Sequence, residues 1–336
     1  MPEQIPQPNK KIEVIPPYEF RKGTKLSDEE KKALSDYLSG LTVEWKGNAK
    51  PREESGRRMF EISRLINNNL LWAKENLGLS LALKKRNISL PKIKFYDPEE
   101  FNKMAEAGEF SHDVQGCVIT EAGDAVILEQ KNERVVLERT NHELIHMLGR
   151  IVVDAKKRDG NQINFFIHKI GYTDERKKQF DVFSEAITEM INLESLAYYQ
   201  KTTGTDYITG CKVGYFVAVI FFDMLIAKLA EKSGLSGQEI RKDLYTGYFT
   251  GQFKYLSLFN KHLGEGTLKK IAGLPKYVLG GMGTTESTEF LFKDKFKEAG
   301  LDYYEFLDKI ERYYAGKEVK LYCGVEVSKN VKPSKI

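Results

Sequence analysis

The residues of this sequence best suited to chemistry are two histidines with a glutamate directly after the first: His142, Glu143 and His146. On an α-helix, residues four apart lie on one face, so both imidazoles can bind the same metal ion. Glu143 would then reach past the metal toward a bound water. The chain contains only five histidines, so chance rarely produces this spacing. We therefore predict a zinc-binding helix over residues 132–150.

A catalytic zinc site needs a third protein ligand besides the two histidines, with one position left open. Metzincins take a third histidine from the extended motif His-Glu-x-x-His-x-x-Gly-x-x-His. Here Gly149 matches the glycine of that motif, but Val152 occupies the place of the last histidine. His112 and His262 have no partner at ligand spacing and are interpreted as structural. The third ligand must therefore come from elsewhere in the chain.

A second helix, predicted to begin near Phe180, carries the motif Glu185-x-x-Thr188-Glu189. With this motif the chain resembles the thermolysin-like gluzincins, which are zinc peptidases whose second metal helix carries Glu-x-x-Ser/Thr-Asp/Glu. The resemblance is confined to the two helices and to the order strand, helix, helix. It implies a zincin-like fold and the hydrolysis of peptide bonds.

The resemblance also assigns roles to individual residues. One zinc ion per chain would be held by His142, His146 and Glu185. Glu143 would be the general base, taking a proton from the water and passing it to the leaving amine. Glu189 would accept a hydrogen bond from a ligand imidazole and so orient it. The implied partner is a peptide or protein substrate.

No motif identifies the donor that would stabilise the tetrahedral intermediate. Tyr172, His168 and Tyr215 are candidates by position alone, and residues of these types are more often packed side chains than oxyanion donors. Two further interpretations of the metal motif stay open. One is a zinc-binding protein without catalytic activity, and the other is a membrane-associated zinc protease.

Composition and charge argue against a nucleic-acid partner. The chain has 336 residues, of which 41% are hydrophobic and 30% charged, and its net charge is only +4. Basic and acidic residues are interspersed, so nucleic acid is not expected as a partner. The three cysteines, Cys117, Cys211 and Cys323, lie far apart and favour a reducing compartment.

Neither an export signal nor a membrane span is expected. The first residues are polar and rich in proline, where a signal peptide would need a basic start and an apolar run. The long apolar stretch from Val213 to Ala230 contains Asp223 and Lys228, which are costly in lipid. We therefore expect a cytoplasmic protein without a membrane partner, in which this stretch is a buried helix.

The predicted fold class is α+β and zincin-like, with a small sheet plus helices in an N-terminal lobe and a mainly helical C-terminal lobe. We divide the chain into a flexible arm (1–20), an N-terminal α/β lobe with the motif helix (21–170), a helical lobe with the third ligand (171–315) and a C-terminal tail (316–336). Alternating residues from Val319 to Val327 indicate a possible strand in that tail.

The strands predicted before the motif helix bear on substrate binding. Leu90 to Tyr96 is one strand, and Gly116 to Thr120 with Ala125 to Gln130 form a hairpin. The second hairpin strand leads directly into the motif helix. It could expose an edge that pairs with an extended peptide, or it could be an ordinary internal strand. A further hairpin, ending with Ile163 to Ile170, is expected after the motif helix.

Overall fold

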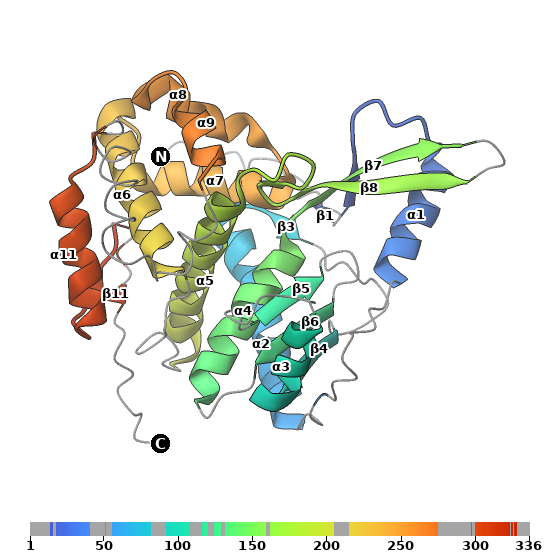
Figure 1. Cartoon of the computed structure of the whole chain (residues 1–336), viewed down its shortest axis with the longest axis horizontal. Helices are drawn as coiled ribbons and strands as arrows, with labels where there is room; N and C mark the ends of the chain where they lie inside the picture. The colour runs from blue at the N-terminus through green and yellow to red at the C-terminus, as the bar shows by residue number, and fades with distance from the viewer. Residues whose placement is uncertain are drawn as a thin grey trace, which may run out of the picture.

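The structure, a computed structural model, describes residues 14–15, 18–40, 51, 56–81, 92–107, 116–119, 124–128, 132–158, 162–204, 215–274, 297, 300–322, 324 and 326–327. In these parts the chain is a mixed α+β protein with small sheets, as expected (Figure 1). Most of the N-terminal arm lies outside the described residues, and so does nearly all of 286–298, whose sequence has an amphipathic pattern.

Three of the strands before the motif helix form a three-stranded mixed sheet in the order β4-β6-β5. β4 (Lys92–Tyr96) runs parallel to β6 (Asp124–Leu128), and β5 (Gly116–Ile119) is antiparallel to β6. β6 thus has a neighbour on both sides. The expected hairpin is confirmed, but the alternative that its second strand exposes an edge is wrong, because β6 is internal.

A second hairpin follows the motif helix and extends away from most of the other helices in Figure 1, toward the helix that follows the N-terminal arm. It pairs β7 (Ile151–Lys157) with β8 (Ile163–Ile170), and short strands β2 (Tyr18–Phe20) and β9 (Thr173–Asp174) complete the sheet. Helix α1 (Asp28–Gly40) begins at a capping box in which Ser27 and Glu30 exchange hydrogen bonds. Its apolar face packs on this hairpin.

The predicted motif helix is α4 (Glu133–Leu148). It begins where the Asn132 side chain accepts a hydrogen bond from the Arg134 backbone, and it ends at Gly149. Its side chains are buried on nearly every face, so polar residues of the helix must find partners inside the protein. These partners come mainly from α5 (Asp181–Thr203) and α2 (Gly56–Trp72), which continues into a π-helical turn, η2 (Ala73–Leu77).

Helices α4 and α5 are antiparallel where their polar side chains meet. As the residue number rises along α4, the partner number falls along α5: Asn141 bonds Asn192, His142 bonds Glu189, and His146 bonds Glu185. The three α5 residues recur at spacings of three and four, so they share one face. This alignment brings two motifs that are distant in sequence into one site.

The rest of the described chain is mainly helical and shares one large apolar cluster. Its helical elements are α6 (Phe216–Ser233), α7 (Gly237–Thr250), η4 (Phe253–Leu256), α8 (Ser257–Leu263), α9 (Thr267–Ala272) and α11 (Tyr303–Tyr314). Among the described residues, none of the helices is long and apolar enough to cross a membrane. The remaining described elements are α3 (Pro98–Glu106) and the paired strands β1 (Val14–Ile15) and β3 (Ser80–Leu81).

The C-terminal tail differs from the single strand expected over residues 319–327. β10 (Val319–Lys320) and β11 (Glu326–Val327) pair antiparallel with each other. Gly324 lies between them with φ +85°, a left-handed conformation that glycine adopts at little cost. The alternating pattern therefore contains a turn.

Candidate metal centre

His142, His146 and Glu185 converge on one point. Their ligand atoms form a near-equilateral triangle: the two Nε2 atoms are 3.1 Å apart, and Glu185 Oε2 is 3.2 Å from each. In the described part of the chain, these residues make up a group that could hold a metal ion. The structure thus brings together the three ligands expected from the sequence.

The triangle fits the dimensions of a small divalent cation. Zinc bonds nitrogen and oxygen ligands at about 2.0–2.1 Å in a tetrahedron, whose edges are then about 3.3–3.4 Å long. The observed separations of 3.1–3.2 Å are close to such an edge. Two imidazoles and one carboxylate also match the protein ligands of many catalytic zinc sites.

The surroundings of the cluster favour positive charge on the His142 imidazole and negative charge on the Glu185 carboxylate. Burial opposes charge on His142, but hydrogen bonds with Glu185 and Glu189 raise the pKa of its imidazole well above the usual range. For Glu185, burial is outweighed by the charge of His146 and by hydrogen bonds to both imidazoles, so the pKa of the carboxyl is lowered. A buried carboxylate facing two ring nitrogens therefore suits a bound cation.

Glu189 lies behind His142, as expected. Its Oε2 is 2.6 Å from His142 Nδ1, and the Glu189 side chain is buried. This contact fixes the ring so that Nε2 faces the centre.

Glu138 adds a feature that the sequence did not reveal. It lies buried near Glu189, and burial together with the Glu189 charge raises the pKa of Glu138 well above its usual value.

Glu143 is close to the cluster and nearly buried, with 8% of its surface exposed. Burial raises its pKa, and the two ligand histidines partly offset that effect. Glu185 is more open: 26% of its side chain is accessible. Part of the Glu185 side chain therefore reaches solvent, while both ligand imidazoles are buried.

The three candidate oxyanion donors have different surroundings. The ring of Tyr215 lies 5.5 Å from that of His142, and Tyr215 begins α6 with φ +56°. Tyr172 is fully buried, and its hydroxyl donates to the Leu244 carbonyl, so it serves packing. His168 is on the β7–β8 hairpin, where its charged neighbours include Asp174 and Arg21 rather than the ligands.

Tyr248 on α7 is a further neighbour of the centre that sequence reasoning missed. Its hydroxyl is 3.2 Å from His146 Nδ1 and 2.9 Å from Thr188 Oγ1. Burial raises the pKa of this phenol. The residue stands about a hundred positions after His146 in the sequence, outside any motif, so only the packing of α7 against α5 reveals it.

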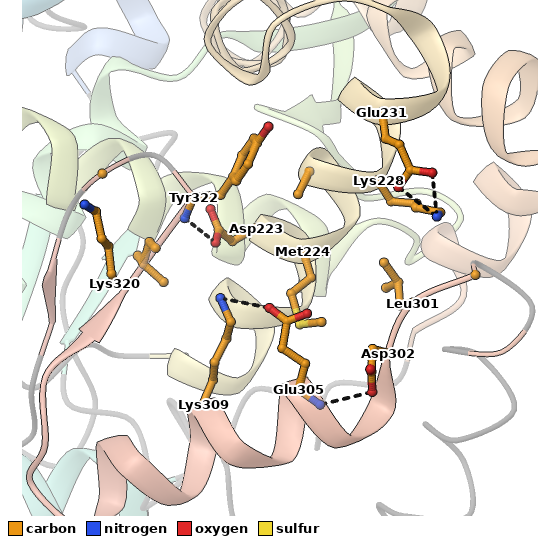
Figure 2. A pocket seen from close by; sticks show the side chains of 14 residues that line it. Asp223, Met224, Lys228, Glu231, Leu301, Asp302, Glu305, Lys309, Lys320 and Tyr322 are labelled. Carbon is orange, nitrogen blue, oxygen red and sulfur yellow. Dashed lines mark hydrogen bonds and ion pairs between the residues drawn. The ribbon is translucent and has the colours of Figure 1, made fainter.

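A cavity of about 540 Å³ lies elsewhere, between α6, α11 and the β10 region (Figure 2). Its lining shares no residue with the metal-ligand group. Charged side chains around it pair with one another, as in Lys228 with Glu231 and Lys309 with Glu305. Asp223 accepts a hydrogen bond from the Tyr322 backbone at 2.6 Å and holds the tail against α6.

Neither a family model, nor a curated protein, nor a solved structure matches this chain.

Proposed function

We propose that the chain is a zinc-dependent metallopeptidase of gluzincin type, with a zincin-like fold. The observation that carries the proposal is the position of Glu185 Oε2, at equal distance from the Nε2 atoms of His142 and His146. A surface pair of helices would not bury two imidazoles and aim both at one carboxylate, because such burial is costly without a bound partner.

His142, His146 and Glu185 would hold the zinc ion, and Glu189 would orient His142. When bound there, zinc would supply a water of near-neutral pKa and would polarise a substrate carbonyl. Three protein ligands leave one position open, as a catalytic site requires. The partial exposure of Glu185 supports access to that position from solvent.

Glu143 would move the proton in this reaction. It follows a ligand directly in the sequence and is nearly buried beside the cluster. Its carboxylate would take a proton from the attacking water and then deliver it to the nitrogen of the leaving amine. Tyr215, whose ring lies against His142, would donate its phenolic proton in a hydrogen bond to the developing oxyanion.

The peptide would bind along β5 rather than β6. Among the described strands, β5 pairs only with β6, and it lies beside α4. An extended peptide could therefore pair with its outer edge by strand addition. This places the backbone of the substrate next to the helix that carries Glu143.

The proposal is tested with zinc analysis and a peptide library. We expect one zinc per chain in the wild type and cleavage that stops on chelation. Glu143→Gln should retain the zinc but cleave about 10²–10⁴ times more slowly, the usual contribution of a general base. Glu133→Gln, an exposed change on the same helix, is the matched control and should leave both properties intact.

If Glu143→Gln cleaves peptides at the same rate as the wild type, the mechanism is refuted. Zinc binding without cleavage of any peptide by the wild type would favour the catalytically inactive alternative. Full zinc occupancy in Glu185→Ala would remove Glu185 from the ligand set.

A further inference from the structure

Tyr248 reaches the back of His146 from a helix that carries none of the ligands. Its phenolic oxygen is 3.2 Å from His146 Nδ1, the ring nitrogen that faces away from Glu185. The same oxygen is 2.9 Å from Thr188 Oγ1, and Thr188 Oγ1 is 2.9 Å from the Ser184 carbonyl oxygen. Both side chains are completely buried. A continuous chain of polar contacts therefore runs from His146 to the backbone of α5.

The donor and acceptor of each hydrogen bond in this network follow from the role of His146. A neutral imidazole that binds a metal through Nε2 carries its proton on Nδ1. His146 Nδ1–H then donates to the Tyr248 oxygen, Tyr248 donates to Thr188 Oγ1, and Thr188 donates to the Ser184 carbonyl. Every donor in the chain has an acceptor, which a buried polar network requires.

Two glycines make room for the Tyr248 ring. A Cβ added to Gly149 would lie 3.1 Å from Tyr248 Cε1, and one added to Gly171 would lie 2.5 Å from Cε2. Gly149 directly follows α4, and Gly171 directly follows β8. The ring is thus packed against the backbone on both sides of the hairpin that leaves the metal helix. Its hydroxyl has little freedom to move away from His146.

We infer that Tyr248 is the positioning residue for His146, holding its Nε2 toward the metal as Glu189 does for His142. The inference rests on the metal-binding part of the proposed function. It does not depend on the hydrolysis of peptides. The inference also gives a role to Thr188, the threonine of the second motif, because its hydroxyl accepts the hydrogen bond from Tyr248.

The test compares Tyr248→Phe with Tyr245→Phe. Tyr245 is on the same helix and equally buried, but its hydroxyl donates to Glu194, which is not a ligand. Zinc affinity, measured by competition with a chelator, should fall about 10–100-fold in Tyr248→Phe and little in Tyr245→Phe. In the cobalt-substituted protein, the visible spectrum should change only in Tyr248→Phe, because the spectrum reports ligand geometry. Equal affinities and equal spectra in the two variants would overturn the inference.

Glycine variants test the same contact without removing the hydroxyl. Gly171→Ala and Gly204→Ala both place an alanine at positive φ, +54° and +71°. Only the first brings a Cβ against Tyr248, since nothing lies within 4 Å at Gly204. Both variants should melt at a lower temperature, but only Gly171→Ala should bind zinc more weakly. Equal zinc affinities in the two folded variants would contradict the role of the ring.

A measurement on the metal-free protein separates this inference from the proposed function. The ¹⁵N shifts of the His146 ring should agree between wild type and Tyr245→Phe and should differ in Tyr248→Phe. If the wild type binds no zinc, the proposed function fails, but this comparison still decides whether Tyr248 holds His146. Coincident shifts in all three proteins would overturn the inference alone.

Discussion

Asn141, the residue before the first ligand, is expected to hold the metal helix in register with α5. Its amide nitrogen donates to Asn192 Oδ1 at 2.8 Å and to Ser195 Oγ at 3.0 Å, and its oxygen accepts from Asn69 Nδ2 at 2.9 Å. All of these side chains are buried. Asn141→Leu keeps the number of side-chain atoms but removes all three hydrogen bonds.

The cost of this change can be estimated from the atoms left behind. Ser195 keeps a partner, because its hydroxyl donates to the Asn192 carbonyl. The Asn69 nitrogen and the Asn192 oxygen lose theirs, and each unsatisfied buried group costs about 1–3 kcal/mol. We therefore expect the free energy of unfolding to fall by about 2–6 kcal/mol. Zinc affinity should fall too, since Glu185 and Glu189 are on the α5 face that Asn192 anchors.

Urea unfolding measures this loss as a shift of the midpoint at constant slope. Asn76→Leu is the control: Asn76 is exposed on η2, and among the described residues its side chain donates only to the nearby Trp72 carbonyl, so its loss should cost about 0.5 kcal/mol or less. A decrease in the free energy of unfolding of less than about 1 kcal/mol in Asn141→Leu would refute the reasoning, because two buried polar groups without hydrogen-bond partners should cost more than that.

Two other predictions concern the groups around the centre. Glu138 has a pKa raised by burial in the folded state, so it binds more protons there than in the unfolded chain, and stability should fall as pH rises above the unfolded pKa of about 4.5. Glu138→Gln cannot ionise and should lose less stability than the wild type between pH 5 and pH 8 in urea titrations; parallel pH dependence in both would contradict this. Zinc at a thousandfold excess over its dissociation constant should stabilise the wild type by about 4 kcal/mol. Differential scanning calorimetry should detect no such gain in Glu185→Ala, and an equal gain would show that zinc binds elsewhere.

The parts of the site that the sequence predicted are those governed by helix periodicity. His142 and His146 are one helical turn apart, and so are Glu185 and Glu189, so each pair had to share a face. The resemblance to gluzincins joined the two pairs, and the contact between Glu189 and His142 has the expected partners. Local pattern also accounts for two helix starts, the capping boxes of α1 at Ser27 and of α7 at Ser236, because each has a Glu three residues after the Ser.

The parts that the sequence did not predict depend on tertiary packing. Tyr248 and Glu138 carry no motif, and only the neighbours of α4 make them part of the site. β6 looked equally suited to an edge or an interior position, because strand order is set by long-range pairing rather than by local pattern. The tail looked like one strand because an alternating pattern does not reveal that Gly324 turns the chain.

The central claim is that His142, His146 and Glu185 hold one zinc ion. A crystal structure of the zinc-loaded protein, with anomalous data collected on both sides of the zinc absorption edge, tests it most directly. We predict a single strong anomalous peak within about 2.0–2.2 Å of both Nε2 atoms and a Glu185 oxygen. A peak at another group of residues, or one that Glu185 does not contact, would contradict the account.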